Sequence, residues 1–122
     1  QLNITAILTL DQVREVATAV RNGPGCIVSV FAGRIADTGV DPVPVMKEAL
    51  GILQSVPQAE LLWASPREVL NIYQADAIGC HIITATNDLL RKLSLAGKDL
   101  SEYSLETVRM FYNDAQNAGY QL

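Results

Sequence analysis

Two kinds of apolar pattern alternate along the chain. Four short runs, at residues 2–8, 26–32, 60–64 and 80–85, are almost continuously apolar. Such runs are typical of strands that are buried on both faces of a parallel sheet. Between them, apolar residues recur every three or four positions, as on one face of an amphipathic helix. The pattern predicts the order βαβαβαβα, followed by a terminal helix at residues 105–117.

Capping signals mark the starts of several of these helices. Thr9 followed by Gln12 predicts a capping box for the first helix. Asp41, followed by a proline, predicts an N-cap with proline at the first helical position. Ser104 is expected to cap the terminal helix, and residues 33–41 are expected to form a loop.

The third crossover carries a further capping signal. Ser65, with Glu68 three residues later, predicts a second capping box. The helix that it opens is expected to run to about Ala75 and to hold Arg67 in its first turn. A short helix is then expected at residues 87–93.

Two architectures fit this order of elements. One is a doubly wound sheet of the flavodoxin type, for which 122 residues is a normal length. Its receiver-like form needs an acidic cluster after the first strand, where only Asp11 lies nearby. The other is half of a (β/α)₈ barrel, since a whole barrel takes ~250 residues. Composition does not separate the two.

The composition fits one small domain over residues 1–122. The chain is 49% apolar and 18% charged, which is enough apolar material for one core. A net charge of −4, with scattered basic residues, argues against a nucleic-acid partner. No apolar run approaches the ~20 residues that cross a bilayer, so no membrane partner is expected. The chain begins at Gln1 without a methionine, which we interpret as a cut rather than a natural start.

Cysteine and histidine are too few for a disulfide framework or a metal site. Cys26 and Cys80 lie in apolar runs and are expected to be buried thiols of a protein in the reducing cytoplasm. The only histidine, His81, follows Cys80, and we expect it to have a structural role. We therefore predict neither a metal nor a cofactor.

Polar side chains lie near the ends of the predicted strands, where parallel α/β sheets bind their ligands. Because successive strand residues face opposite sides, residues two apart share a face. The pairs that share a face in this way are Asn3 and Thr5, Ser29 and Phe31, Trp63 and Ser65, and Ile82 and Thr84. We expect the hydroxyl groups to point into a barrel interior, with Trp63 filling that interior one layer deeper than Ser65.

Two arginines follow strands of the predicted sheet. Arg34 comes after the second strand and Arg67 after the third. A pair of guanidinium forks, together with hydroxyls and the N–H groups of a helix start, suits a phosphate monoester. Each residue also has a plainer interpretation, in which Ser65 only caps a helix and Arg34 is a solvated residue paired with Asp37.

These residues resemble motifs of the transaldolase family. Residues 29–35, Ser-Val-Phe-Ala-Gly-Arg-Ile, look like the family's Ser-Pro-Phe-Val-Gly-Arg-Ile, and residues 63–67 resemble its Ala-Ser-x-Arg. Residues 3–5 resemble its Asn-x-Thr strand, and residues 79–84 its Gly-x-Asp-x-x-Thr strand. The resemblance covers nearly the whole chain and is greatest to the short fructose-6-phosphate aldolase-like branch. It implies the C-terminal half of a (β/α)₈ barrel, strands five to eight.

The resemblance also implies an activity of carbohydrate (pentose phosphate) metabolism. The family forms a Schiff base between a lysine on strand four and a ketose, and then transfers or cleaves a dihydroxyacetone unit. Carried over by position, Arg34 and Arg67 would bind the sugar phosphate with help from Ser65. The other positions carried over are Asn3 and Ser29 for substrate hydroxyls, Thr5 for the catalytic water, and Phe31 for the pocket lining.

The Schiff-base lysine has no counterpart here. Lys47, Lys92 and Lys98 all lie outside the predicted strands, so the chain alone is expected to be inactive. The expected partners are a sugar phosphate, the missing N-terminal half or a second copy, and further copies in a homo-oligomer, since in relatives a C-terminal helix packs on a neighbouring subunit. Two alternatives remain: a phosphosugar-binding half-barrel that is not an enzyme, and a structural domain.

Overall fold

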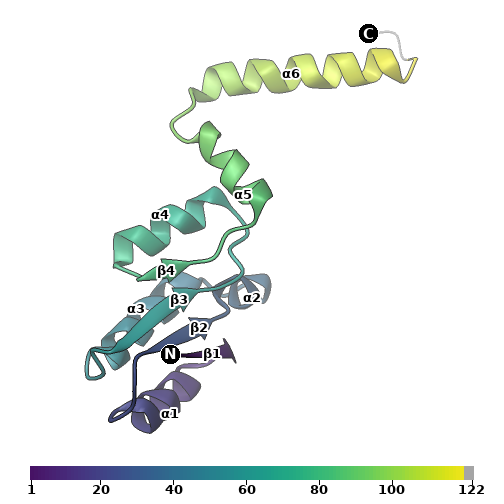
Figure 1. Cartoon of the computed structure of the whole chain (residues 1–122). Helices are drawn as coiled ribbons and strands as arrows, with labels where there is room; N and C mark the ends of the chain where they lie inside the picture. Colours follow the sequence, from purple (N-terminus) through teal and green to yellow (C-terminus); the bar gives the residue numbers. More distant parts are fainter. Residues whose placement is uncertain (120–122) are drawn as a thin grey trace. The chain divides into compact units, whose positions relative to one another are not determined.

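The computed structural model describes residues 1–119. The chain divides into two compact units, Gln1–Lys92 and a second unit that begins at Leu93. The first unit contains a sheet and the helices that cover it, and the second contains one long helix (Figure 1).

Four strands form a single sheet in the first unit, and each strand pairs in parallel with the next along the chain. The strands are β1 (Leu2–Ile7), β2 (Cys26–Val30), β3 (Ala59–Trp63) and β4 (Ile82–Ile83). The predicted parallel sheet is confirmed. The sequential order is that of a barrel, whereas a flavodoxin-type sheet places its first strand between later ones, so the doubly wound alternative is wrong.

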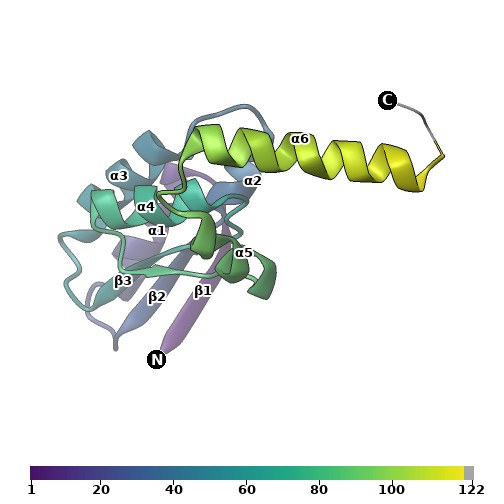
Figure 2. The same cartoon turned by 90° about the horizontal axis from the view of Figure 1, so that it is seen from above.

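Helices cover one face of this sheet, and α1, α3 and α4 lie on the same side of the strands in Figure 2. The helices of the first unit are α1 (Leu10–Val20), α2 (Ala32–Asp37), α3 (Pro42–Leu53), α4 (Val69–Ile78) and α5 (Asn87–Lys92). A single apolar core joins this layer to the sheet, with Val28 and Leu61 from the strands against Val13 and Met46 from the helices. Burial of this apolar surface is the main force that holds the layers together.

The strand register shows which side chains face the helices. Val30 pairs with Trp63, and both are buried members of the core. The prediction that Trp63 fills the barrel interior is wrong, because its side chain is 0% exposed and belongs to the core between the sheet and the helices. The opposite face carries Ser29 and its register partner Leu62, neither of which belongs to that core.

Two of the predicted caps are confirmed. The Thr9 hydroxyl accepts a hydrogen bond from the Gln12 backbone N–H at 3.2 Å, and the Gln12 side chain accepts one from the Thr9 N–H at 3.1 Å. The Asp41 side chain accepts from the Val43 N–H at 3.0 Å, with a proline in the first turn. Both caps depend only on neighbouring residues, so the sequence pattern is sufficient to predict them.

The expected loop at residues 33–41 contains a short helix. α2 begins at Ala32, directly after Phe31, so the second strand ends at Val30 rather than at Ala32. Phe31 provides no side-chain cap for this helix. A six-residue helix with no polar cap has no local sequence signal.

Ser65 does not begin a helix. Its φ of 58° is left-handed, whereas an N-cap residue adopts an extended backbone conformation. The N-cap of α4 is Glu68, which forms a capping box with Asn71. The helix runs beyond Ala75 to Ile78, and it ends at Gly79 with a φ of 80°. Arg67 therefore precedes the helix instead of lying in its first turn.

The fourth strand is shorter than predicted, and β4 contains only two residues. Before it, the Nδ1 atom of His81 accepts a hydrogen bond from the backbone N–H of Leu61 at 2.9 Å. The Cys80 thiol lies 3.4 Å from the carbonyl oxygen of Leu61. The side chains of His81 and Cys80 therefore bind backbone groups of β3 before the point at which the β4 backbone begins to pair with that strand. Of the two thiols predicted to be buried, Cys26 is fully buried, whereas Cys80 is only partly buried.

The second unit contains a 3₁₀ turn (Leu93–Leu95) and α6 (Leu100–Asn117). α6 begins five residues earlier than predicted, because Asp99 rather than Ser104 is its N-cap and accepts from the Glu102 N–H at 3.0 Å. None of its residues is buried. Within residues 1–119, no helix combines the length and the apolar character needed to cross a membrane.

Candidate functional site

The segments that follow the strands are joined by backbone hydrogen bonds at the C-terminal end of the sheet. The Phe31 N–H donates to the Ile7 oxygen at 2.9 Å, and the Ala64 N–H donates to the Val30 oxygen at 2.8 Å. The Thr84 N–H donates to the Trp63 oxygen at 3.2 Å. The pairing of the sheet therefore continues past the strand ends and brings four segments together.

The closest approach among these segments is between Gly33 and Ser65. The Gly33 N–H donates to the Ala64 oxygen at 3.2 Å. A Cβ atom built on Gly33 would lie 1.5 Å from the Ser65 carbonyl oxygen, so only glycine fits at this position. This contact fixes the start of α2 against the residues that follow β3.

A pocket of about 290 Å³ opens between the segments that follow β3 and β4. We call it the C-terminal pocket, and its lining residues are Ser65, Pro66, Arg67, Thr84, Ala85 and Thr86. The lining includes three hydroxyl groups and one guanidinium group. Of the predicted site residues, Ser65 and Arg67 are thus brought together, with Thr84 beside them.

Arg67 is held by an acidic partner from the neighbouring segment. Its Nη2 lies 2.7 Å from Asp37 Oδ2, and its Nε lies 3.4 Å from Asp37 Oδ1. The two side chains are 48% and 55% exposed. The hydrogen bond from Arg67, assisted by the charges of Arg67 and Arg34, holds the pKa of Asp37 below its usual value. Asp37 therefore stays ionised at neutral pH and lies in the field of both arginines.

Arg34 lies beside Phe31 at the start of α2. Its guanidinium carbon is 5.8 Å from the centre of the Phe31 ring, which is within the range of a cation–π contact. Arg34 is exposed, as its plainer interpretation expects, but the ion pair of Asp37 is with Arg67 rather than with Arg34. Arg34 does not line the C-terminal pocket, but its charge helps to lower the pKa of Asp37, so we call Arg34, Asp37 and Arg67 the charged neighbourhood of this end of the sheet.

Asn3 and Ser29 meet on the face of the sheet that the helices do not cover. The Ser29 hydroxyl donates to Asn3 Oδ1 at 2.7 Å, and Ser29 is 3% exposed. Thr5 is exposed and lies next to a bulge in β1, where Ala6 has a φ of 61° and the register shifts. The strand pattern correctly predicts that Asn3 and Ser29 share this side.

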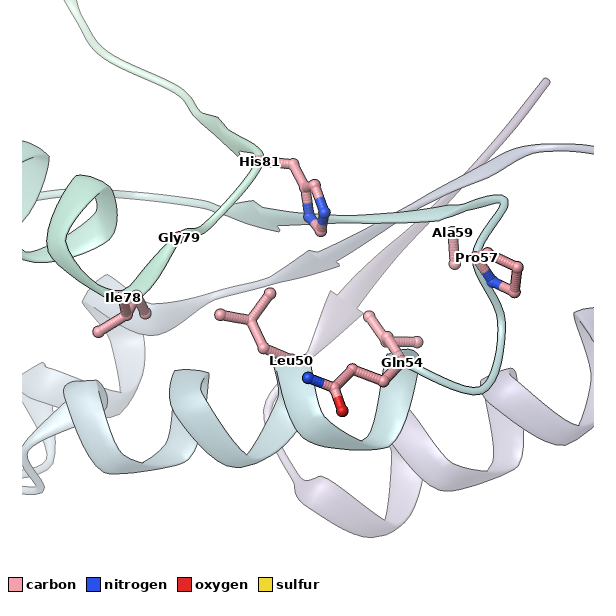
Figure 3. Close-up of a pocket in the computed structure, with 8 residues that line it drawn as sticks. Leu50, Gln54, Pro57, Ala59, Ile78, Gly79 and His81 are labelled. Atoms are coloured by element: carbon pink, nitrogen blue, oxygen red, sulfur yellow. The ribbon is translucent and has the colours of Figure 1, made fainter.

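A second pocket, of about 300 Å³, lies at the opposite end of the strands. We call it the N-terminal pocket; Figure 3 shows Leu50 of α3 and Gln54, which follows the end of α3, beneath His81 and the start of β3. Its side chains include no arginine, lysine or carboxylate. Its volume matches that of the C-terminal pocket, but it has no fixed charge with which to hold a charged ligand.

The C-terminal end of the sheet carries guanidinium and hydroxyl groups, which are the kinds of donor that phosphate sites use. Guanidinium forks and hydroxyls provide charge-assisted and neutral donors from two neighbouring segments. Within residues 1–119, no three His, Cys, Asp or Glu side chains gather as a metal site. The three lysines lie on α3, on α5 and before α6, outside all the strands.

The sequence interpretation assigned no role to Gly33 and paired Asp37 with Arg34 instead of Arg67. Gly33 and Asp37 lie four positions apart on α2, and therefore on the same face of it. That spacing is informative only once residues 32–37 are known to be helical. No local cap marks this helix, so the sequence alone does not reveal the relation between the two residues.

Comparison with known proteins gives a consistent result. The sequence profile of the Transaldolase/Fructose-6-phosphate aldolase family matches residues 1–122. A probable transaldolase of Mesorhizobium japonicum is 34% identical over 93 residues, which cover 75% of this chain and 41% of that protein. A probable transaldolase of Streptococcus equi subsp. zooepidemicus is 31% identical over 93 residues, covering 75% and 42%.

A longer match is to a probable transaldolase of Thermoanaerobacter, 27% identical over 121 residues, which cover 98% of this chain and 52% of that protein. The chain thus spans about half the length of the curated relatives that it matches. The parallel sheet in sequential order agrees with half of the barrel fold of this family. The chain therefore belongs to the transaldolase/fructose-6-phosphate aldolase family.

Proposed function

We propose that this chain provides the phosphate-binding side of a transaldolase-like site that acts on ketose phosphates. The observation that carries the proposal is the C-terminal pocket, where Ser65 and Arg67 line a space of about 290 Å³. Arg34 lies in the same charged neighbourhood, since it acts on the pKa of Asp37. A dianionic phosphate would be held by the two guanidinium forks and the Ser65 hydroxyl.

The substrate's hydroxyl groups would lie along the face of the sheet that carries Asn3 and Ser29. Because the Ser29 hydroxyl donates to Asn3 Oδ1, the amide orientation of Asn3 is fixed. The Asn3 NH₂ group is then available to donate to a sugar oxygen. Thr5, exposed beside the bulge of β1, would position the catalytic water, and Phe31 would line the pocket.

The covalent step would use a lysine from the other half of the barrel. In this family's chemistry, the amine condenses with the ketose carbonyl and releases water. The resulting iminium then accepts the electron pair of the carbon–carbon bond that breaks. None of Lys47, Lys92 and Lys98 lies on a strand of the sheet. A dihydroxyacetone unit would be transferred or released, depending on the acceptor.

The second candidate is a half-barrel that binds phosphosugars without chemistry. The position of the three lysines favours it, because they lie on helices or before α6. It uses the same phosphate pocket and differs only in the absence of a covalent intermediate.

Borohydride trapping separates the two functions. The full-length protein is incubated with fructose 6-phosphate, reduced with borohydride, digested and examined by mass spectrometry. We expect one reduced adduct on a lysine outside this chain. An adduct on Lys47, Lys92 or Lys98 would contradict the proposal, while phosphate-dependent binding without any adduct would support the second candidate.

The second unit provides a surface for assembly with other copies. Leu105, Val108 and Phe111 of α6 are between 51% and 63% exposed, and they recur at the spacing of one helix face. We expect α6 to pack against a neighbouring subunit in a homo-oligomer of a cytoplasmic enzyme. Replacement of Val108 and Phe111 by serine should shift the light-scattering mass of the protein to that of a smaller species. An unchanged mass would contradict this role of α6.

A further inference from the structure

Among the described residues, Asp37 is the acidic side chain that contacts a guanidinium group of the proposed phosphate site. It is the last residue of α2, and Arg67 precedes α4, so their contact joins the segments that follow β2 and β3. A carboxylate beside a phosphate site has two possible effects. It can compete with the ligand for the guanidinium, or it can hold the guanidinium in place for the ligand.

The geometry of the contact distinguishes these effects. A guanidinium group has two edges that each offer a pair of N–H donors, one through Nε and Nη2 and the other through Nη1 and Nη2. Asp37 uses the first edge, with contacts to Nε at 3.4 Å and to Nη2 at 2.7 Å. No other hydrogen bond to the Arg67 guanidinium is found within residues 1–119. The second edge is therefore available to a ligand while Asp37 stays bound.

Asp37 is itself held in position. Gly33, four residues earlier on the same face of α2, packs directly against the Ser65 carbonyl and donates to Ala64. This face of α2 is thus fixed on the segment that carries Ser65 and Arg67. A carboxylate on a fixed helix face restricts the long Arg67 side chain, which would otherwise lose rotamer freedom when it binds a ligand.

We propose that Asp37 is a positioning residue of the phosphate site, which holds the Nε–Nη2 edge of Arg67 so that its Nη1–Nη2 edge faces the phosphate. This inference rests on the function proposed above. Both side chains are about half exposed, so solvent screens the repulsion between Asp37 and a bound phosphate. Arg34 and Arg67 together still leave the neighbourhood one positive charge in excess of Asp37.

A double-mutant cycle tests the inference in the full-length protein. Fructose 6-phosphate and unphosphorylated fructose are titrated calorimetrically into the parent, Asp37→Asn, Arg67→Ala and the double variant. We expect Asp37→Asn to weaken binding of the phosphorylated sugar about 5-fold and to leave fructose unchanged. In the Arg67→Ala background, Asp37→Asn should have no further effect, because Asp37 acts through Arg67. Asp37→Glu, which keeps the carboxylate, should recover part of the loss.

A matched control uses Asp11→Asn on α1. Asp11 also pairs with an arginine at 2.7 Å, so the control removes one exposed ion pair and one charge outside the site. It should leave the affinities for both sugars unchanged.

Three results would overturn the inference. Tighter or unchanged binding of the phosphorylated sugar by Asp37→Asn would show a competing or irrelevant carboxylate. An undiminished 5-fold effect in the Arg67→Ala background would show that Asp37 acts by another route. An equal loss for both sugars would show a merely structural role. A parent protein with no preference for the phosphorylated sugar would instead contradict the proposed function itself, and this inference with it.

Discussion

The two ends of the sheet contain pockets of almost equal size that are built in different ways. The C-terminal pocket, of about 290 Å³, lies where backbone packs on backbone and where Arg67 meets Asp37. The N-terminal pocket, of about 300 Å³, lies among apolar side chains with His81 and Gln54 at its edge. The two pockets therefore differ in fixed charges and in a backbone geometry that only special residues tolerate, and not in volume.

The largest effect is expected from Gly33→Ala, which disturbs the backbone packing at the C-terminal pocket. The added Cβ atom would lie 1.5 Å from the Ser65 carbonyl oxygen, so α2 must separate from the segment after β3. We expect a loss of at least about 3 kcal/mol in the free energy of unfolding and no measurable binding of fructose 6-phosphate. Urea denaturation and calorimetric titration provide the two measurements.

Gly51→Ala is the control for that substitution. Gly51 lies within α3 and has open space where a Cβ atom would be placed. Alanine there should stabilise the protein by about 0.5–1 kcal/mol and leave binding unchanged. If Gly33→Ala behaved like Gly51→Ala, the close contact at the C-terminal end would not hold the site together.

The next largest effect is a loss of affinity for the phosphorylated sugar when either arginine is replaced. Arg34→Ala or Arg67→Ala should weaken binding of fructose 6-phosphate roughly 10- to 100-fold, because each removes charge-assisted contacts to the phosphate. Lysine should recover only part of the affinity, since a point charge cannot replace a bidentate fork. Titration with unphosphorylated fructose should show no change. Two alanine variants that keep the parent's preference for the phosphorylated sugar would refute the phosphate site.

A smaller effect, confined to stability, is expected at the N-terminal end. His81→Ala leaves the backbone N–H of buried Leu61 without its acceptor, which should cost about 1–2 kcal/mol of unfolding free energy. His81→Asn can offer a carbonyl oxygen near the position of Nδ1 and should recover part of that loss. Fructose 6-phosphate should bind all three proteins with the same affinity within a factor of two. A tenfold loss of affinity would mean that the two ends are coupled.

The smallest effect concerns pH. Asp37 has a depressed pKa in the folded protein, so its pair with Arg67 contributes stability above the unfolded value of about 3.9. That contribution is lost as the pH falls through the folded pKa. Unfolding curves of the parent and of Asp37→Asn should therefore differ by a constant amount from about pH 5 to 8 and converge below about pH 4. A difference that grows on acidification would contradict the sign of the shift.

The features that the sequence predicts well are those decided by neighbouring residues or by strand alternation. The Thr9 and Asp41 caps use partners within three positions, and the two arginines follow strands that apolar runs identify. The interpretation fails where distant contacts decide the backbone. Ser65 is a residue type that commonly caps helices. In the structure, however, its backbone is left-handed where it packs against Gly33.

The same reason explains the errors at Trp63 and Asp37. Alternation alone does not say which face of a strand the helices cover, and Trp63 lies on the covered face with Val30. The partner of Asp37 depends on residues 32–37 being helical, which no local cap indicates. The kinds of residue at the site could be predicted from the sequence, but the pairing between them could not.

The two outer strands of the sheet have a consequence for aggregation. β1 has a bulge at Ala6, where its register with β2 shifts, and β4 contains only two residues. A bulge and a short strand both interrupt the row of backbone groups that a foreign strand needs for pairing. Both outer strands therefore offer only short regular stretches for intermolecular β-sheet growth. The irregularities that make the sheet harder to predict thus also lower its tendency to aggregate through its edges.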